Sequence, residues 1–305
     1  MNITEDRLAR ASLTRLFEPL DTVGLALVAK HGTHAALRIA IGARPAFVFP
    51  GVKEEDLARG LSRWQSRFAE LSTENDLATV ERLGGGFLIP GDEHWPTALD
   101  DLPDAPLGLW YVGNIEQGIP KPSKIVSLTG SRDCTAYGGS IAGEFAYGLA
   151  QKEICIASGL AYGIDAHSHR GALAGSTGEG PATIAVMAGG VDRIYPSGNA
   201  DLGTAIQAHG LVLSELPPTS APTRARFLAR NRIIAALAGV TCVVEARHRS
   251  AALGTARQAE TLGRKVAIVP GSIHSANSAG CHELAREGSA VLVTDTAELF
   301  ELLVG

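Results

Sequence analysis

The sequence lacks the features of several common protein classes. It has four widely spaced cysteines and no Cys-x-x-Cys pair, so we expect neither a disulfide framework nor a zinc site. No uninterrupted apolar run is long enough to cross a bilayer, and the N-terminus lacks the basic segment and apolar core of a signal peptide. These absences favour a reduced, cytoplasmic location without a membrane partner.

The chain also has no strong net charge of either sign. Over 305 residues the formal net charge is −5 at pH 7, and charged residues make up 19% of the sequence. A nucleic-acid ligand would therefore have to be bound by a local basic surface and not by the whole molecule. The apolar fraction of 45% suits a globular protein, with room for one large α/β domain and a smaller one.

The sequence patterns of nucleotide-dependent enzymes are absent. The turn after the first strand of the predicted α/β domain, Gly130-Ser131-Arg132, has one glycine where the dinucleotide fingerprint requires Gly-x-Gly-x-x-Gly, and no Walker A sequence occurs. His167 and His169 are two residues apart on a predicted helix and point in different directions, which makes them a poor metal pair. No catalytic constellation emerges, so we predict no enzyme, no cofactor and no metal.

Residues 1–82 are predicted to form a small helical domain. Leu8, Leu13 and Leu16 recur at helical spacing, as do Leu57 and Leu61 further on. A supporting or protein-contact role is the simpler interpretation, and a nucleic-acid helix-hairpin-helix is the alternative, although no clear Gly-x-Gly hairpin occurs. Residues 83–122 are predicted to be an ordered connector that belongs to the second domain.

Residues 83–305 are predicted to form an extended Rossmann-like domain. Strand-like runs lie at 125–129, 153–157, 182–187, 210–214, 240–244, 265–269 and 290–293. Helical segments separate them, as in βα units. Several runs are apolar throughout, as expected of strands buried on both faces. The prediction is an α/β fold with a doubly wound, mostly parallel sheet whose ligand lies at the carboxyl ends of the strands.

Small, Gly-rich turns lie where the predicted strands end. Within residues 125–171, each of two predicted strands is followed by such a turn and then by a helix. At the start of a helix, free backbone N–H groups and the helix dipole favour an anion. Glycine lets a ligand approach the backbone closely, Ser131 and Ser158 offer hydroxyl groups, and Arg132 can bind a phosphate in a bidentate way. We therefore predict a phosphate site at these turns.

Positive charge concentrates in residues 224–232. This stretch holds four arginines and one aromatic residue, Phe227. On a helix, Arg226 and Arg230 share one side, so part of the cluster can face a ligand. When a protein binds single-stranded nucleic acid, guanidinium groups bind the phosphate backbone and a base stacks on an aromatic ring. The residue types in this stretch suit such a ligand. Arginines on a helix are more often solvated or paired internally, and Asn231 could be structural, so both interpretations stay open.

Several different short motifs lie along residues 88–303. Each motif is short, but their order and spacing taken together are specific. They are Gly130-Ser131-Arg132, Ser158-Gly159-Leu160-Ala161-Tyr162-Gly163-Ile164-Asp165-Ala166, His169-Arg170-Gly171-Ala172-Leu173, Ile194-Tyr195-Pro196, Ser214-Glu215-Leu216-Pro217-Pro218, Phe227, Arg230-Asn231-Arg232-Ile233-Ile234-Ala235, Val243-Val244-Glu245-Ala246, Thr255-Ala256-Arg257, Gly263-Arg264 and Val269-Pro270-Gly271. With this set, the chain resembles the DprA/Smf family, the DNA-processing proteins of bacterial natural transformation.

The resemblance implies a non-enzymatic protein that binds and protects incoming single-stranded DNA and loads the RecA recombinase on it. It also implies an extended Rossmann-like domain, a homodimer and a cytoplasmic location. Phosphates would lie against the two Gly-rich turns, with a base near Phe227. The DNA-binding residues that the resemblance implies are Gly130, Ser131, Arg132, Ser158, Gly159, Ala161, Gly163, Ile164, Asp165, Arg224, Phe227, Arg230, Asn231, Arg232, Ser250 and Thr255.

The chain departs from the family pattern in three places. Residues 249–253 are Arg-Ser-Ala-Ala-Leu where Arg-Ser-Gly-Ser-Leu is usual, and Tyr162 stands where arginine is frequent. Both changes weaken a possible phosphate contact. The chain ends at Gly305, directly after the last predicted helix, so we expect no C-terminal winged-helix domain.

A nucleotide-binding or nucleotide-hydrolysing enzyme on the same fold is the alternative function. Phosphoribohydrolases of the lysine-decarboxylase-like type carry Pro-Gly-Gly-x-Gly-Thr-x-x-Glu, whereas residues 252–258 lack the leading Pro-Gly-Gly and have Gln258 in place of the glutamate. A structural dimeric scaffold is the third candidate. For the leading hypothesis, Arg132→Ala and Arg230→Ala are each expected to weaken salt-sensitive binding to oligo-dT without unfolding the protein.

Overall fold

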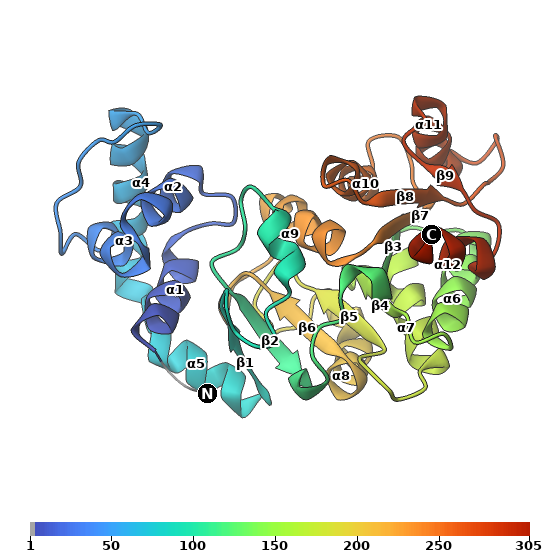
Figure 1. Ribbon diagram of the computed structural model, residues 1–305, viewed down its shortest axis with the longest axis horizontal. Coiled ribbons are helices and arrows are strands. Elements are labelled where there is room, and N and C mark those ends of the chain that lie inside the picture. Colours follow the sequence, from blue (N-terminus) through green and yellow to red (C-terminus); the bar gives the residue numbers. More distant parts are fainter. Residues whose placement is uncertain (1–3) are drawn as a thin grey trace.

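A nine-stranded sheet is the frame of the molecule in the computed structural model, which describes residues 4–305 (Figure 1). The strands are β1 (Gly85–Leu88), β2 (Leu109–Gly113), β3 (Ile125–Gly130), β4 (Cys155–Ser158), β5 (Thr183–Val186), β6 (Leu211–Ser214), β7 (Val240–Glu245), β8 (Lys265–Ile268) and β9 (Val291–Leu292). Their order is β1-β2-β6-β5-β4-β3-β7-β8-β9. The strands from β6 across to β9 pair in parallel, whereas β1 and β2 are antiparallel to their neighbours.

Each of the seven strand-like runs in the sequence corresponds to one strand, from β3 to β9. The predicted α/β fold with a mostly parallel sheet is therefore confirmed. The sequence gives no sign of β1 and β2, which lie inside the segment 83–122 that was expected to be a connector. They are short, and they exist because they pair with each other and with β6, which is distant in sequence. Local periodicity cannot show such a pairing.

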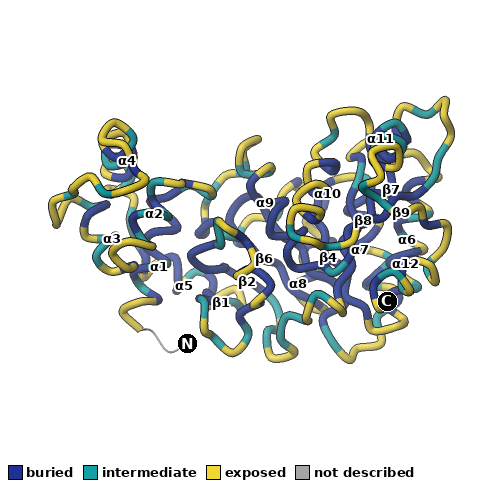
Figure 2. The backbone as a smooth tube through the Cα atoms, turned by 45° about the horizontal axis from the view of Figure 1, so that its top comes forward, coloured by how far each residue is buried: buried dark blue, intermediate teal, exposed yellow. Residues whose placement is uncertain are grey.

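Helices cover both faces of the sheet. On one face lie α6 (Ala136–Ala150), α7 (Ile164–Gly175), α8 (Ala200–His209) and α12 (Thr296–Val304), and on the other α9 (Arg224–Leu237), α10 (Ala251–Thr261) and α11 (Ala279–Glu287). Figure 2 shows the central strands buried and the exposed backbone in the outer helices and loops. Burial on both faces explains why β4, β5 and β6 are apolar almost without interruption. Within residues 4–305, no helix is long and apolar enough to cross a membrane.

Five helices precede the sheet, in agreement with the helical prediction for this region. They are α1 (Glu5–Leu16), α2 (Thr22–His31), α3 (Thr33–Ala40), α4 (Glu54–Arg67) and α5 (Thr73–Arg82). The first four form a separate core around the fully buried Trp64 and lie beside the β1 edge of the sheet (Figure 1). The fifth packs on the sheet itself, because Leu77 and Val80 share a core with Phe87 and Trp110. The division of the chain at residue 82 stays a prediction.

The sheet reverses its winding between β3 and β7. From β3 the chain adds β4, β5 and β6 on one side, and then returns to add β7, β8 and β9 on the other. The loops after β3 and β7 therefore diverge at the carboxyl edge of the sheet, which is where doubly wound folds bind their ligands. Residues 131–135 and 246–250 are these two loops.

Candidate nucleic-acid interface

A carboxylate of the protein occupies the start of α6. Glu245, the last residue of β7, accepts hydrogen bonds from the backbone N–H of Thr135 at 2.8 Å and from the Thr135 hydroxyl at 2.6 Å. Thr135 is the N-cap of α6, so the carboxylate lies where the helix dipole favours an anion. Gly130 is the sheet partner of Glu245. Glu245 therefore lies where a phosphate was expected, and the phosphate site at this helix N-terminus stays a prediction.

The turn before α7 is likewise held from within. The Ile164 N–H donates to the Ser131 carbonyl at 3.1 Å, and the Ala161 N–H donates to the Asp165 carboxylate at 3.3 Å. Ser158 is fully buried, and its hydroxyl donates to a carbonyl of β3 at 2.6 Å. The Ser131 hydroxyl donates to the backbone of its own loop. These groups shape the turn and do not face solvent.

Two glycines of the predicted site allow close packing inside the protein. Gly163 has φ 73°, and a Cβ at this position would clash with the backbone of Ser131 and Arg132. A Cβ at Gly159 would clash with the guanidinium group of Arg230. Backbone contacts therefore require glycine at position 163, whereas at position 159 the missing Cβ leaves room for the Arg230 guanidinium group. This requirement differs from the ligand approach that the sequence suggested.

Arg230 fills the space next to Gly159. Its Nη1 donates to the carbonyl of Gly159 at 2.9 Å and also to the carbonyl of Val186. Burial lowers the pKa of Arg230 to about 10, although the Asp165 carboxylate acts in the opposite direction. Burial in turn raises the pKa of Asp165, and the charge of Arg230 lowers it. Arg230 is therefore still a cation at neutral pH, and its guanidinium group is buried at the carboxyl ends of the strands.

Other predicted residues of this region have internal partners. Arg232 is 2% exposed and donates to Glu215 at 2.8 Å, with Asp104 on its other side. The Asn231 side chain donates to the Ala251 carbonyl at 3.2 Å, which ties α9 to the start of α10. Thr255 is buried within α10. We therefore leave Arg232, Asn231 and Thr255 out of the proposed contact surface.

An open cavity of about 590 Å³ lies over the first turn of α9. It is hereafter called the Phe227 cavity, and its wall includes Arg132, Tyr195, Pro222, Thr223, Arg224, Phe227, Leu228, Arg249, Ser250, Ala251 and Gly254. The guanidinium carbon of Arg132 lies 4.6 Å from the centroid of the Phe227 ring, and that of Arg230 lies 5.8 Å from it. The Tyr195 ring centroid is 5.9 Å away. An aromatic ring among cations is thus presented to solvent.

The Phe227 cavity carries a net positive charge. Arg132, Arg224 and Arg249 are exposed, and none of them has an ion-pair partner in the described part of the chain. A second cavity of about 700 Å³ shares Arg249, Ser250 and Gly254 with the Phe227 cavity and continues toward α11. The arginines of the Phe227 cavity come from three segments that are far apart in the sequence and meet at the point where the sheet reverses its winding.

The structure therefore separates the predicted residues into two groups. Arg132, Arg224, Phe227 and Ser250 line the cavity. The remaining residues form the turns and core behind it. Seven of the eleven wall residues are absent from the predicted set, among them Tyr195 and Arg249. Arg249 could have been found as part of the basic stretch after β7, whereas Tyr195 reaches Phe227 only through the fold.

The chain is similar in sequence to proteins that process DNA. A family model described as DNA recombination-mediator protein A matches residues 86–304. The putative DNA processing protein DprA of Mycobacterium tuberculosis is 41% identical over 242 residues, which cover 75% of this chain and 60% of that relative. The chain thus spans about 60% of the length of this relative.

Two solved structures share the fold. The X-ray structure of DNA processing protein A from Streptococcus pneumoniae is 30% identical, with a TM-score of 0.74 and coverage of 99% of this chain and 98% of the other. A structure of DNA processing protein A from Helicobacter pylori, reported for its single-stranded DNA binding mode, is 30% identical with a TM-score of 0.63 and covers 70% and 94%. The chain therefore belongs to the DNA recombination-mediator protein A family, the DprA/Smf family that its motifs resemble.

Proposed function

We propose that the chain binds single-stranded DNA in the Phe227 cavity. The observation that carries the proposal is the Phe227 ring, which lies beside Arg132 in a cavity whose three exposed arginines have no ion-pair partner among residues 4–305. A base can stack on such a ring while guanidinium groups bind the neighbouring phosphates, which is the usual combination for single strands. In a duplex the bases are already stacked and paired, so the ring has nothing to bind. The single-strand binding described for the Helicobacter pylori relative supports the proposal.

The biological role that we propose follows from membership of the family. The chain would protect incoming single strands during natural transformation and load the RecA recombinase on them, as a cytoplasmic homodimer without enzymatic activity. This role can be tested by following RecA filament formation on oligo-dT with and without the chain. An unchanged rate of filament formation would contradict the loading role and leave the DNA-binding proposal intact.

The alternative function is a nucleotide hydrolase. The positions of two carboxylates at the carboxyl edge of the sheet disfavour it. Glu245 is bound to Thr135, and Asp165 is buried. Neither lines the Phe227 cavity, so neither is placed to act on a nucleotide bound there. Release of ribose phosphate from a nucleoside monophosphate would favour the hydrolase.

The binding test compares three ligands by fluorescence anisotropy. Labelled oligo-dT is expected to bind in a salt-dependent manner, while a duplex of the same length and mononucleotides compete weakly. Equal affinity for duplex and single strand would contradict a single-strand site. Competition by mononucleotides alone would point to the hydrolase class.

Arg132→Ala and Arg224→Ala are each expected to weaken oligo-dT binding and to reduce its salt dependence. Each phosphate contact on a single strand contributes about 0.7 to the slope of log affinity against log salt. The slope of each variant should therefore fall by about that amount. The control is Arg59→Ala, because Arg59 is an exposed arginine on α4, away from the cavity. An equal loss of slope in the control would show that only net charge matters.

A further inference from the structure

The first turn of α9 carries Arg224 and Phe227 but lies outside the hydrophobic core. Residues 229–237 of this helix are all buried, whereas residues 224–228 are exposed or half-buried, and Leu228 is 55% exposed. A helix end without packing opens easily, because its first N–H groups also lack partners within the helix. The Thr223 hydroxyl caps this turn by accepting from the Arg226 N–H at 3.2 Å, and an anchor from outside the helix would restrict the turn further.

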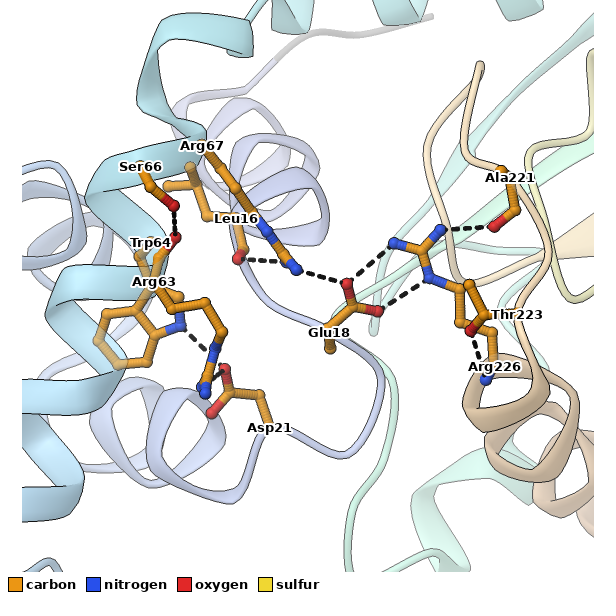
Figure 3. Close-up of polar contacts among 10 residues, drawn as sticks. All are labelled: Leu16, Glu18, Asp21, Arg63, Trp64, Ser66, Arg67, Ala221, Thr223 and Arg226. Carbon is orange, nitrogen blue, oxygen red and sulfur yellow. Dashed lines mark hydrogen bonds and ion pairs between the residues drawn. The ribbon is translucent and has the colours of Figure 1, made fainter.

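A carboxylate from the N-terminal helices supplies this anchor. Glu18 lies in the loop between α1 and α2 and faces Arg226, in the first turn of α9 (Figure 3). Nε and Nη2 of Arg226 donate to the two carboxylate oxygens of Glu18, both at 2.9 Å. The third nitrogen, Nη1, donates to the Ala221 carbonyl at 2.6 Å. Two parallel bonds between planar groups restrict direction as well as distance.

The same carboxylate is held from the opposite side by Arg67 of α4. Nη2 of Arg67 donates to Glu18 at 2.6 Å, and its Nη1 donates to the Leu16 carbonyl at 3.0 Å (Figure 3). The side chains of Glu18 and Arg226 are only 33% and 19% exposed. The ion pair between Glu18 and Arg226 is therefore partly enclosed and not a solvated surface pair. It connects α9 to residues 5–82, which hold α1 to α5 and are hereafter called the helical unit.

The position of Glu18 also suits the electrostatics of α9. The first turn of α9 has no acidic residue, and its two arginines lie where the helix dipole is positive as well, which is unfavourable. Burial by itself raises the pKa of Glu18, but the hydrogen bond from Arg226 and the charges of Arg226 and Arg67 lower it overall. The carboxylate is therefore ionised at neutral pH and offsets this positive charge.

A second contact joins the helical unit to the loop before α9. Nη2 of Arg15 donates to the Pro218 carbonyl at 2.8 Å and to Asp76 of α5 at 2.5 Å. The loop from β6 to α9 is thus held at Pro218, and the helix that follows it is held at Arg226. Both contacts come from the segment that precedes the sheet, Arg15 from α1 and Glu18 from the loop between α1 and α2.

We propose that Glu18 is a positioning residue for DNA binding. Through Arg226, it holds the first turn of α9 so that Arg224 and Phe227 are kept at the cavity. Arg226 is not part of the cavity wall, so its guanidinium serves the connection to the helical unit and not the strand. The N-terminal helices thereby contribute to affinity without touching DNA. The DNA-binding part of this inference rests on the proposed function.

The test is Glu18→Gln, which removes the charge and keeps the size of the side chain. In the DNA-free protein, amide hydrogen exchange in residues 223–228 should become faster. Binding of oligo-dT should weaken by about threefold to tenfold, because the apparent Kd rises as the fraction of binding-competent protein falls. The slope of log affinity against log salt should stay unchanged, because no group that contacts phosphate is lost.

A matched control and a double-variant cycle sharpen this test. Asp56→Asn removes one carboxylate charge from the same helical unit, where Asp56 pairs with Arg59 on the exposed side of α4; it should change neither exchange nor binding. Arg226→Gln should weaken binding as much as Glu18→Gln, and the double variant should be no weaker than either, because both act through one contact. Additive losses would overturn the proposal.

Other outcomes separate this inference from the proposed function. Tighter binding by Glu18→Gln would mean that Glu18 repels the strand or masks Arg226, and unchanged binding would mean that it positions nothing; both overturn the inference. If the unsubstituted chain does not bind oligo-dT, the proposed function fails, but hydrogen exchange in residues 223–228 still tests the connection. Unchanged exchange in both single variants overturns the connection even if the unsubstituted chain binds DNA.

Discussion

Replacing Phe227 with alanine is expected to weaken oligo-dT binding by roughly fivefold to 150-fold, since stacking of one base on an aromatic ring contributes about 1–3 kcal/mol. The ring is half-buried and lies close to Arg132 and Tyr195 at the rim of the cavity. Its loss removes the stacking surface and leaves the phosphate-binding arginines in place. Affinity should therefore fall while the salt slope changes little.

Two further variants test whether stacking is the cause. Phe227→Tyr keeps an aromatic face and should retain most of the affinity. Phe47→Ala removes a ring that is 75% exposed, in the loop between α3 and α4, and should leave binding unchanged. The measurement is anisotropy with labelled oligo-dT at several salt concentrations. If Phe227→Ala binds as well as the unsubstituted chain, no base stacks on this ring and the Phe227 cavity is not the DNA site.

Arg230→Ala is expected to lower the free energy of unfolding by about 2–6 kcal/mol, counting about 1–3 kcal/mol for each of two carbonyls left without a partner. These carbonyls belong to Gly159 and Val186, and both accept from the buried Nη1 of Arg230. The loss also removes the cation that lowers the pKa of the buried Asp165 carboxyl. The sequence suggests that this substitution leaves the fold intact, and the buried position of the guanidinium changes that expectation.

Urea unfolding followed by circular dichroism measures this effect. Arg224→Ala is the matched control, because Arg224 belongs to the same helix and is exposed, so its loss should change stability by less than about 0.5 kcal/mol. DNA affinity of the Arg230 variant should be measured only where the variant is folded. A variant as stable as the unsubstituted chain, with weaker binding, would show that Arg230 acts directly on the strand.

The α/β frame could be predicted from the sequence because its signals are local. Strands β3 to β8 are buried on both faces or nearly so, which requires apolar runs that differ from the helices between them. The chemistry of the cavity was also visible in part, since Arg132, Arg224 and Phe227 lie in motifs or in a basic stretch. Strands β1 and β2 could not be predicted, because their existence depends on pairing with β6.

The four arginines of α9 mark the limit of what the sequence by itself determined. Their types and helical spacing predict a basic segment, but only the tertiary structure decided that Arg224 is exposed at the cavity and that the others are held by the protein. Arg226 binds Glu18, Arg230 binds backbone carbonyls, and Arg232 binds Glu215. A cation removed from water must find a partner. Here those partners come from distant segments, so the sequence around an arginine does not show whether it is free to bind DNA.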